Sequence, residues 1–306
     1  MKLRSWALPA VVVALAIASA LEPAFAAPPN WQDALTGRLQ RIKETRTVHL
    51  GFRESAVPFS YVGPDARPVG YSLDICAEIV ALIAAELDIV APQVQYVRVS
   101  AQDRIERVVT GAVDLECGST TNTAERRQRV AFSPVIFVTG TRLAVPRGSA
   151  IRGVENLAGR NVAVVGGTTN EAAMREIDRL RGLGMTFVAA DDYRDALTLL
   201  TSGKVEALAA DDALLRGVLA ETGKARDFLL VGEMLSFEPY GIVYPRDDPG
   251  LAEAVDRALR MLAESREIVW IYNRWFMRPL PSRGALALPM SVQLKRSLEL
   301  IGLPAE

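Results

Sequence analysis

The segment 113–126, VDLECGSTTNTAER, combines the residue types that bind a small anion. A short apolar run is followed by a Gly-Ser-Thr-Thr loop and then by a charged segment that is typical of a helix start. Hydroxyl and backbone N–H groups at Ser119, Thr120 and Thr121 converge at such a start, with Arg126 further along. The loop lacks the P-loop lysine. We therefore expect it to bind a carboxylate rather than a nucleotide.

Two more arginines stand at expected strand ends. Arg53 follows the strand-like run 48–52, and Arg104 lies in the first turn of an expected helix. Ligands of parallel α/β sheets bind beyond the carboxyl ends of the strands. A cation in the first helical turn opposes the helix dipole, so Arg104 is either functional or a solvated surface charge. Because guanidinium groups bind carboxylates in a bidentate manner, three such arginines favour a carboxylate site.

The second half of the chain repeats the strand–loop–helix pattern at 166–170, where Thr168 and Thr169 supply hydroxyl and N–H groups. A plain helix N-cap is the alternative for these threonines. Asp211 and Asp212 follow a strand, and we expect one of them to cap the next helix and the other to accept hydrogen bonds from an ammonium group. Tyr193 lies on the same side of its sheet. Together with the arginines, these groups predict an amino-acid zwitterion as ligand, with an acidic side chain.

Alternating strand and helix patterns must position these residues. Apolar runs predict strands at 48–52, 94–99, 113–116, 161–165, 186–190, 205–209, 228–231 and 240–244. Apolar spacing of 3.6 residues predicts helices at 31–46, 71–87, 102–110, 171–180, 192–201, 213–221, 250–263, 267–276 and 291–301. Such alternation indicates an α/β protein with mostly parallel sheets flanked by helices.

Two connectors, at 137–142 and 237–241, separate the repeated units. If both cross between lobes, lobe 2 is a continuous insertion at 141–239, and lobe 1 is formed by 27–140 and 240–306. Two lobes joined by two strands form a hinge, and ligand sites favour the cleft between domains.

Residues 1–26 read as a cleavable signal peptide, with Lys2 and Arg4 before an apolar core and an Ala-Phe-Ala cleavage site. A membrane anchor is the alternative. We expect an exported, periplasmic protein. The net charge of −1 and the lack of a basic stripe argue against a nucleic-acid partner.

The two cysteines, Cys76 and Cys117, form either a disulfide or two buried thiols, and the sequence leaves the choice open. Together with the single histidine, His49, they cannot build an ordinary zinc site, so we expect no metal and no cofactor. His49 stands in the strand-like run 48–52, where a structural role is expected.

Several motifs together resemble the periplasmic glutamate/aspartate-binding proteins, the family 3 solute-binding components of ABC importers. They are GFRESAVPFSY at 51–61, GYSLD at 70–74, ECGSTTN at 116–122, DDALL at 211–215 and YG at 240–241. The resemblance implies a type II periplasmic-binding-protein fold with a two-strand hinge. It also implies a monomer that closes on one amino acid and delivers it to the membrane subunits of an ABC permease.

By motif position, the resemblance assigns Arg53 and Arg104 to the ligand's side-chain carboxylate. It assigns Arg126, Thr121 and Thr169 to the α-carboxylate, and Ser119 and Asp211 to the α-ammonium.

Two positions depart from the family pattern. Ala101 replaces a polar residue and Tyr193 replaces a histidine, so the side-chain end of the pocket loses donors. A different polar amino acid therefore stays open as ligand. The same fold also suits an exported enzyme of the cyclohexadienyl-dehydratase type, with Glu54 or Asp211 as the general acid or base, and a detached sensor module.

Overall fold

The computed structural model describes residues 35–281 and 284–305, so the expected signal peptide lies outside the described part. The first sheet has the order β5-β1-β6-β15-β7. Its strands are β5 (Gln93–Arg98), β1 (Thr47–Phe52), β6 (Leu115–Glu116), β15 (Val243–Pro245) and β7 (Val130–Phe132). Pairing is parallel at β5-β1-β6 and antiparallel on both sides of β15, so four strands share one direction.

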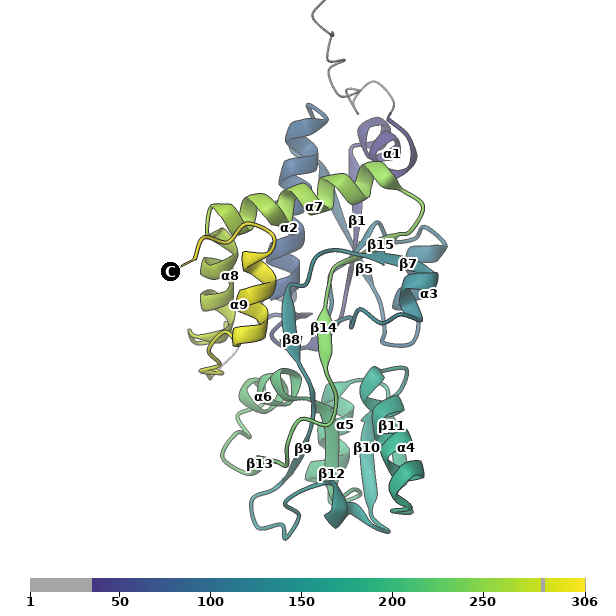
Figure 1. Cartoon of the computed structure of the whole chain (residues 1–306), viewed down its shortest axis with the longest axis vertical. Helices are drawn as coiled ribbons and strands as arrows, with labels where there is room; N and C mark the ends of the chain where they lie inside the picture. Colours follow the sequence, from purple (N-terminus) through teal and green to yellow (C-terminus); the bar gives the residue numbers. More distant parts are fainter. Residues whose placement is uncertain (1–34, 282–283, 306) are drawn as a thin grey trace, which may run out of the picture. The chain divides into compact units, whose positions relative to one another are not determined.

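In the described part of the chain, six helices belong to the lobe of this sheet (Figure 1). They are α1 (Gly37–Thr45), α2 (Tyr71–Glu86), α3 (Arg104–Val109), α7 (Pro249–Glu264), α8 (Glu267–Phe276) and α9 (Val292–Glu299). The first three pack on the strands of the sheet, the next two pack on α1 and α2 and on each other, and the last lies against β8 (Phe137–Thr139). Helix α7 begins where Asp248 accepts the Leu251 N–H and Pro249 occupies the first turn, as helix starts favour. A small antiparallel sheet, β2 (Ser55–Ala56), β3 (Ser60–Val62) and β4 (Pro68–Val69), follows β1.

The second sheet repeats this plan with the order β11-β10-β12-β9-β13. Its strands are β11 (Thr186–Ala190), β10 (Asn161–Val165), β12 (Ala207–Asp211), β9 (Thr141–Pro146) and β13 (Phe228–Val231), and β9 alone among them runs opposite to the rest. Its helices are α4 (Thr169–Arg181), α5 (Tyr193–Thr201) and α6 (Asp212–Glu221). The buried apolar side chains of this lobe include Leu143, Val145, Leu157, Val162, Val164 and Met174.

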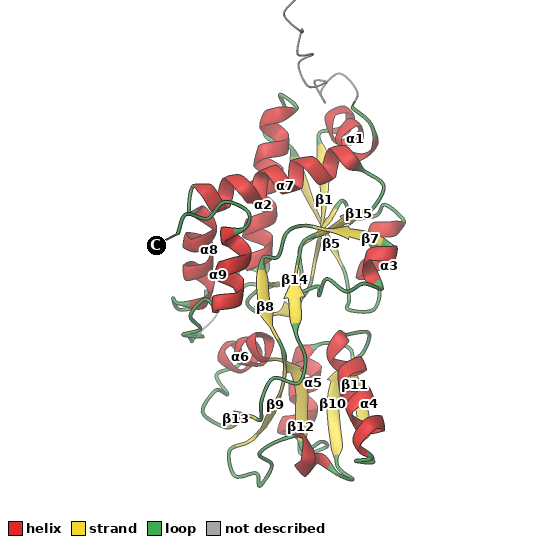
Figure 2. Ribbon diagram, in the orientation of Figure 1, coloured by secondary structure: helices red, strands yellow, loops and turns green. Residues whose placement is uncertain are grey.

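Two strands connect the lobes (Figures 1 and 2). β8 (Phe137–Thr139) and β14 (Glu238–Tyr240) pair antiparallel, with Glu238 opposite Thr139. Aromatic rings pack around this pair on the lobe 1 side: Phe137 lies 4.8 Å from Phe59 and 4.7 Å from Phe276 by ring centroids. The two-lobe α/β fold with mostly parallel sheets and a two-strand hinge, predicted from the sequence, is confirmed.

Three local predictions differ from the structure. The segment after Thr121 forms no α-helix, and only a 3-10 turn, Arg126–Gln128, follows. The strand expected at 205–209 lies two residues later, so Asp211 ends β12 instead of following it. The single strand expected at 240–244 is two strands, because β14 pairs in the hinge and β15 in the first sheet.

None of the helices within 35–281 and 284–305 has both the length and the apolar character that crossing a membrane requires.

Candidate functional site

Arg53 follows β1 directly, and its side chain is buried, with 2% of the residue exposed. Its backbone N–H donates to Ser60 Oγ at 2.9 Å, which fixes the start of the side chain. Nη1 is buried without a hydrogen-bond partner, and the guanidinium carbon lies 5.8 Å from the centre of the Tyr193 ring. Burial lowers the pKa of Arg53, and the nearby charge of Arg104 lowers it further. A buried cation with an unused donor beside another cation favours an anionic ligand.

Arg104 is the first residue of α3 and is also only 2% exposed. Its Nη1 donates to the carbonyl of Ser119 at 3.2 Å, while its Nε has no partner. Ser119 Oγ is likewise buried and without a hydrogen-bond partner. Arg104 is therefore not a solvated surface arginine, and its side chain reaches the Gly-Ser-Thr-Thr loop.

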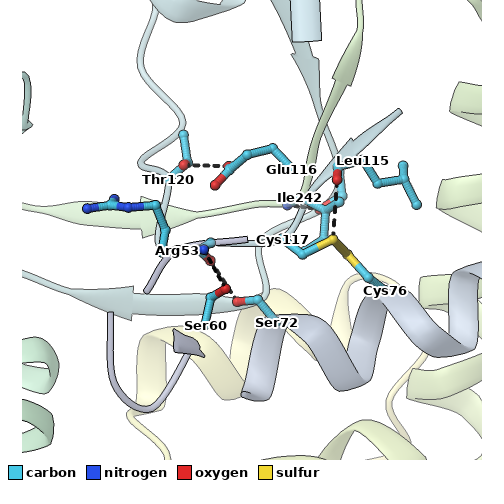
Figure 3. The surroundings of a disulfide bond; sticks show 11 residues. Arg53, Ser60, Ser72, Cys76, Leu115, Glu116, Cys117, Thr120 and Ile242 are labelled. Carbon is cyan, nitrogen blue, oxygen red and sulfur yellow. Dashed lines mark hydrogen bonds between the residues drawn. A yellow bond between two sulfur atoms is a disulfide. The ribbon is translucent and has the colours of Figure 1, made fainter. Parts of the chain in front are cut away.

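The loop that carries Ser119 is tied to α2 (Figure 3). Cys76 and Cys117 form a disulfide with a Cα–Cα distance of 6.3 Å, which resolves the choice that the sequence left open. One turn earlier on α2, Ser72 Oγ donates to the carbonyl of Gly118 at 2.7 Å. The loop is therefore held in place by a covalent bond and a buried hydrogen bond before any ligand binds.

Arg126 approaches the same loop from its other end. Its Nη1 donates to the carbonyl of Thr121 at 3.0 Å. Burial lowers the pKa of Arg126 to about 10, and the charge of Arg104 acts in the same direction. Arg104 thus lies within electrostatic reach of both Arg53 and Arg126. The predicted helix dipole does not contribute here, because no α-helix follows the loop.

The second lobe presents the N-terminus of α4 to the cleft. Thr168 is its N-cap: the hydroxyl accepts from Glu171 N–H and donates to the carbonyl of Val165 at 2.7 Å, so it serves the helix. Thr169, the first residue of α4, has its Oγ1 3.2 Å from Thr121 Oγ1 of lobe 1. Of the two predicted threonines, the side chain of Thr169 is the one that meets the opposite lobe.

Two further predicted residues lie near the arginines. Tyr193 starts α5, and its N–H donates to Ser55 Oγ of lobe 1 at 3.2 Å. Asp211 ends β12, where its carboxylate accepts from Tyr240 OH at 2.5 Å and from Asn170 Nδ2 at 2.9 Å.

The environment of Asp211 changes its acidity. Burial raises the pKa of Asp211 to about 7, and the negative charge of Glu238 raises it as well, while the hydrogen bonds from Tyr240 and Asn170 oppose the shift. An ammonium ligand would favour the ionised form of this carboxyl group.

Glu238 is not among the site residues that the sequence predicts. Its carboxylate is buried in the hinge, with 3% of the residue exposed. Oε2 accepts from Thr121 Oγ1 and from Thr169 Oγ1, both at 2.6 Å, and Oε1 accepts from Ser236 Oγ at 2.7 Å. From the sequence, the motif FEPYG at 237–241 indicates only a connector. The one feature that could have pointed to a site residue is the single charge, Glu238, in a connector expected to pass beside the cleft.

Two cavities lie between residues of both lobes. One, of about 380 Å³, is lined by Arg126 and Thr169 and by neighbours that include Ala101, Gln102, Glu125, Arg129, Gly167 and Ala172. The other, of about 260 Å³, is lined by Arg53, Glu54, Arg98, Asp103, Asp191 and Asp192 among others. Glu54, a predicted alternative acid–base group, forms an ion pair with Arg98 in this second cavity.

Comparison with known proteins gives the family. Residues 48–278 match the model of the bacterial extracellular solute-binding proteins, family 3. The chain is 38% identical over 282 residues to the L-glutamate/L-aspartate-binding protein of Pseudomonas aeruginosa, covering 92% of this chain and 93% of that protein. It is 35% identical over 273 residues to the glutamate/aspartate import solute-binding protein of Escherichia coli, covering 89% of each.

Solved structures agree with this match. The P235GK mutant of ArgBP from T. maritima has a TM-score of 0.71 and 27% identity, covering 79% of this chain and all of that one. The ancestral amino acid-binding protein AncCDT-1, a precursor of cyclohexadienyl dehydratase, has a TM-score of 0.68, covering 78% of this chain and 99% of that one. At 23% identity the latter likeness concerns the fold alone. The chain belongs to the bacterial extracellular solute-binding proteins of family 3.

Proposed function

We propose that this protein captures an acidic amino acid, glutamate or aspartate, and delivers it to an ABC permease. The observation that carries the proposal is the group of three arginines, two of which are buried with unused nitrogen donors. Buried cations with unpaired donors are costly, and a dicarboxylic ligand offsets that cost with charge-assisted hydrogen bonds.

In the proposed complex, Arg53 and Arg104 hold the side-chain carboxylate, since they lie together at the end of the cleft that Tyr193 borders. Arg126 binds the α-carboxylate, together with the backbone N–H groups of Thr121 and of Thr169 at the start of α4.

Ser119 and Asp211 contact the α-ammonium. Lobe 1 captures the ligand, and lobe 2 closes over it about the hinge, which excludes water and strengthens each charged contact.

The two glutamate/aspartate-binding relatives support the ligand class, at 38% and 35% identity over most of the chain. Family membership supports an extracytoplasmic location and an ABC importer as partner. We propose that 1–26 is removed on export, that lobe 2 extends over 141–239, and that 27–140 and 240–306 form lobe 1.

A thermal-shift panel of the twenty amino acids against residues 27–306 tests the ligand class, because a ligand that binds the folded state raises its melting temperature. We expect L-glutamate and L-aspartate to give the largest shifts. A larger shift with a neutral or basic amino acid would refute the assignment.

A parallel turnover assay with cyclohexadienyl acids tests the enzyme alternative. We expect no product, since Glu54 pairs with Arg98 and both oxygens of Asp211 already accept hydrogen bonds.

A further inference from the structure

We propose that Glu238 is a positioning residue that decides which groups of the site donate hydrogen bonds and which accept them. It accepts a hydrogen bond from each hydroxyl of Thr121 and Thr169, so both hydroxyls face the ligand as acceptors. This inference rests on the proposed amino-acid function and goes beyond it, because Glu238 itself need not touch the ligand.

The argument begins with the proton count at each hydroxyl. A threonine hydroxyl has one proton to donate and two lone pairs that accept. Thr121 Oγ1 and Thr169 Oγ1 both donate to Glu238 Oε2 at 2.6 Å. Neither hydroxyl then has a proton left for a ligand carboxylate, and what each offers to the cleft is a lone pair. A lone pair suits the N–H donors of an α-ammonium group.

The position of Glu238 is well fixed. Its backbone pairs with Thr139 in the hinge, and its second oxygen accepts from Ser236 Oγ. Ser236 is itself held, since its Oγ accepts the backbone N–H of Thr141 at 3.1 Å. The carboxylate is therefore locked at the hinge, where it reaches a hydroxyl from each lobe.

This arrangement divides the two ends of an amino acid. The α-carboxylate is left to the Arg126 guanidinium and to backbone N–H groups at the start of α4. The α-amine meets acceptors: the two threonine hydroxyls and the Asp211 carboxylate. A dicarboxylate that lacks the amine would face those acceptors with nothing to donate, so Glu238 selects for the amine.

The test compares L-glutamate with glutarate, which has both carboxylates but no amine, by calorimetry and by thermal shift. Glu238→Gln keeps the size of the side chain but removes the negative charge that attracts both hydroxyl protons, and it replaces one acceptor oxygen with a donor. A threonine hydroxyl that faces the amide nitrogen must turn its proton toward the cleft. We expect this variant to lose L-glutamate affinity by about tenfold or more. Binding of glutarate should stay equal or become tighter.

Glu233→Gln is the matched control, because it makes the same chemical change at an exposed residue of the segment that leads to the hinge strand. It should leave both affinities unchanged. Equal losses of L-glutamate and glutarate binding in Glu238→Gln would show a merely structural role and overturn the inference.

A double-mutant cycle decides the matter even where glutarate binds too weakly to measure. Thr121→Val removes one hydroxyl, and its effect on L-glutamate affinity should be smaller in the Glu238→Gln background than in the wild type, because that hydroxyl is already misdirected there. Additive losses would overturn the inference. If the wild type binds no acidic amino acid at all, the proposed function fails instead, and the two failures are thereby distinguished.

Discussion

The arginine side and the carboxylate side of the cleft differ in how fully their hydrogen bonds are satisfied. On the arginine side, Arg53 Nη1, Arg104 Nε and Ser119 Oγ are buried without partners. On the carboxylate side, both oxygens of Asp211 and both oxygens of Glu238 accept hydrogen bonds from the protein.

This difference indicates that the arginine side binds the ligand's charges, while the carboxylate side holds the site in shape. The unsatisfied donors of the arginine side gain most from a ligand, because unpaired buried polar groups are costly. The carboxylate side is already organised, and it shapes the cleft through hydroxyl orientation and the placement of negative charge. The following predictions break or sharpen this contrast, beginning with the largest expected effect.

Removing a cation from the arginine side should abolish binding. Arg126→Ala leaves the ligand's α-carboxylate buried without its main partner, a loss of about 3–5 kcal/mol. Calorimetry with L-glutamate should show no measurable heat. Arg127→Ala is the control, since Arg127 is exposed and donates to Asn122 instead. An unchanged affinity in Arg126→Ala would reject the assignment of this arginine to the site.

Opening the disulfide should loosen the arginine side alone. The bond closes a loop between cysteines 41 residues apart. The double variant Cys76→Ser/Cys117→Ser lacks this bond, and its free energy of unfolding should be lower by about 2–4 kcal/mol. The reason is that the bond restricts the unfolded chain. Urea unfolding monitored by circular dichroism measures this loss.

The same double variant should bind L-glutamate more weakly, because the Ser119 loop is anchored by Cys117. Full affinity in the folded double variant would show that the Ser72–Gly118 hydrogen bond suffices to hold the loop.

Preventing the two lobes from closing should weaken binding without altering the arginine side or the carboxylate side of the cleft. Gly217 of α6 lies against lobe 1, where an added Cβ would meet the carbonyl oxygen of Val57 at 1.9 Å. Gly217→Ala should therefore oppose closure, at a cost of about 1–3 kcal/mol in ligand affinity. Calorimetry gives the affinity, and small-angle scattering with ligand reports closure.

Gly148→Ala is the matched control for this variant, because nothing lies within 4 Å of the Cβ it adds. Equal affinities for the two variants would mean that this contact plays no part in closure.

Acid should weaken the carboxylate side first. The pKa of Asp211 is raised to about 7, chiefly by burial and then by Glu238. Below pH 7 the carboxyl gains a proton and can no longer pair with an ammonium, so L-glutamate affinity should fall between pH 8 and pH 5.5. The decline should not exceed about tenfold per pH unit, the limit for one titrating group.

Asp211→Asn should bind more weakly and lose this pH dependence, while the exposed control Asp227→Asn should keep it. A flat profile in the wild type would remove Asp211 from the ammonium subsite.

Local patterns predict most of the second lobe. The strands at 161–165, 186–190 and 228–231 are predicted to the residue, because each is an apolar or β-branched run between turn residues. β9 is not predicted, since its first residues resemble part of a connector, although the strand continues to Pro146 and lies inside the sheet.

The site is predictable where a residue type alone implies a chemistry. Guanidinium groups imply anions, which makes Arg53, Arg104 and Arg126 candidates for the site, although their meeting depends on strand order. Glu238 cannot be found in this way, because its role comes from two hydroxyls that lie 117 and 69 residues away along the chain. The prediction of a helix after Thr121 is wrong because a Ser/Thr-rich loop before charged residues is also typical of an irregular turn.

The position of β15 has a consequence for the order in which the chain folds. β15 lies between β6 and β7, yet it is synthesised more than 100 residues after them. A chain that emerges N-terminus first therefore holds an unfinished first sheet, with β6 and β7 lacking their shared neighbour, while the strands of the second sheet are already complete. The inserted lobe can thus fold before the lobe that surrounds it in sequence. Truncation before residue 243 should leave the first sheet, which positions the arginines, without β15.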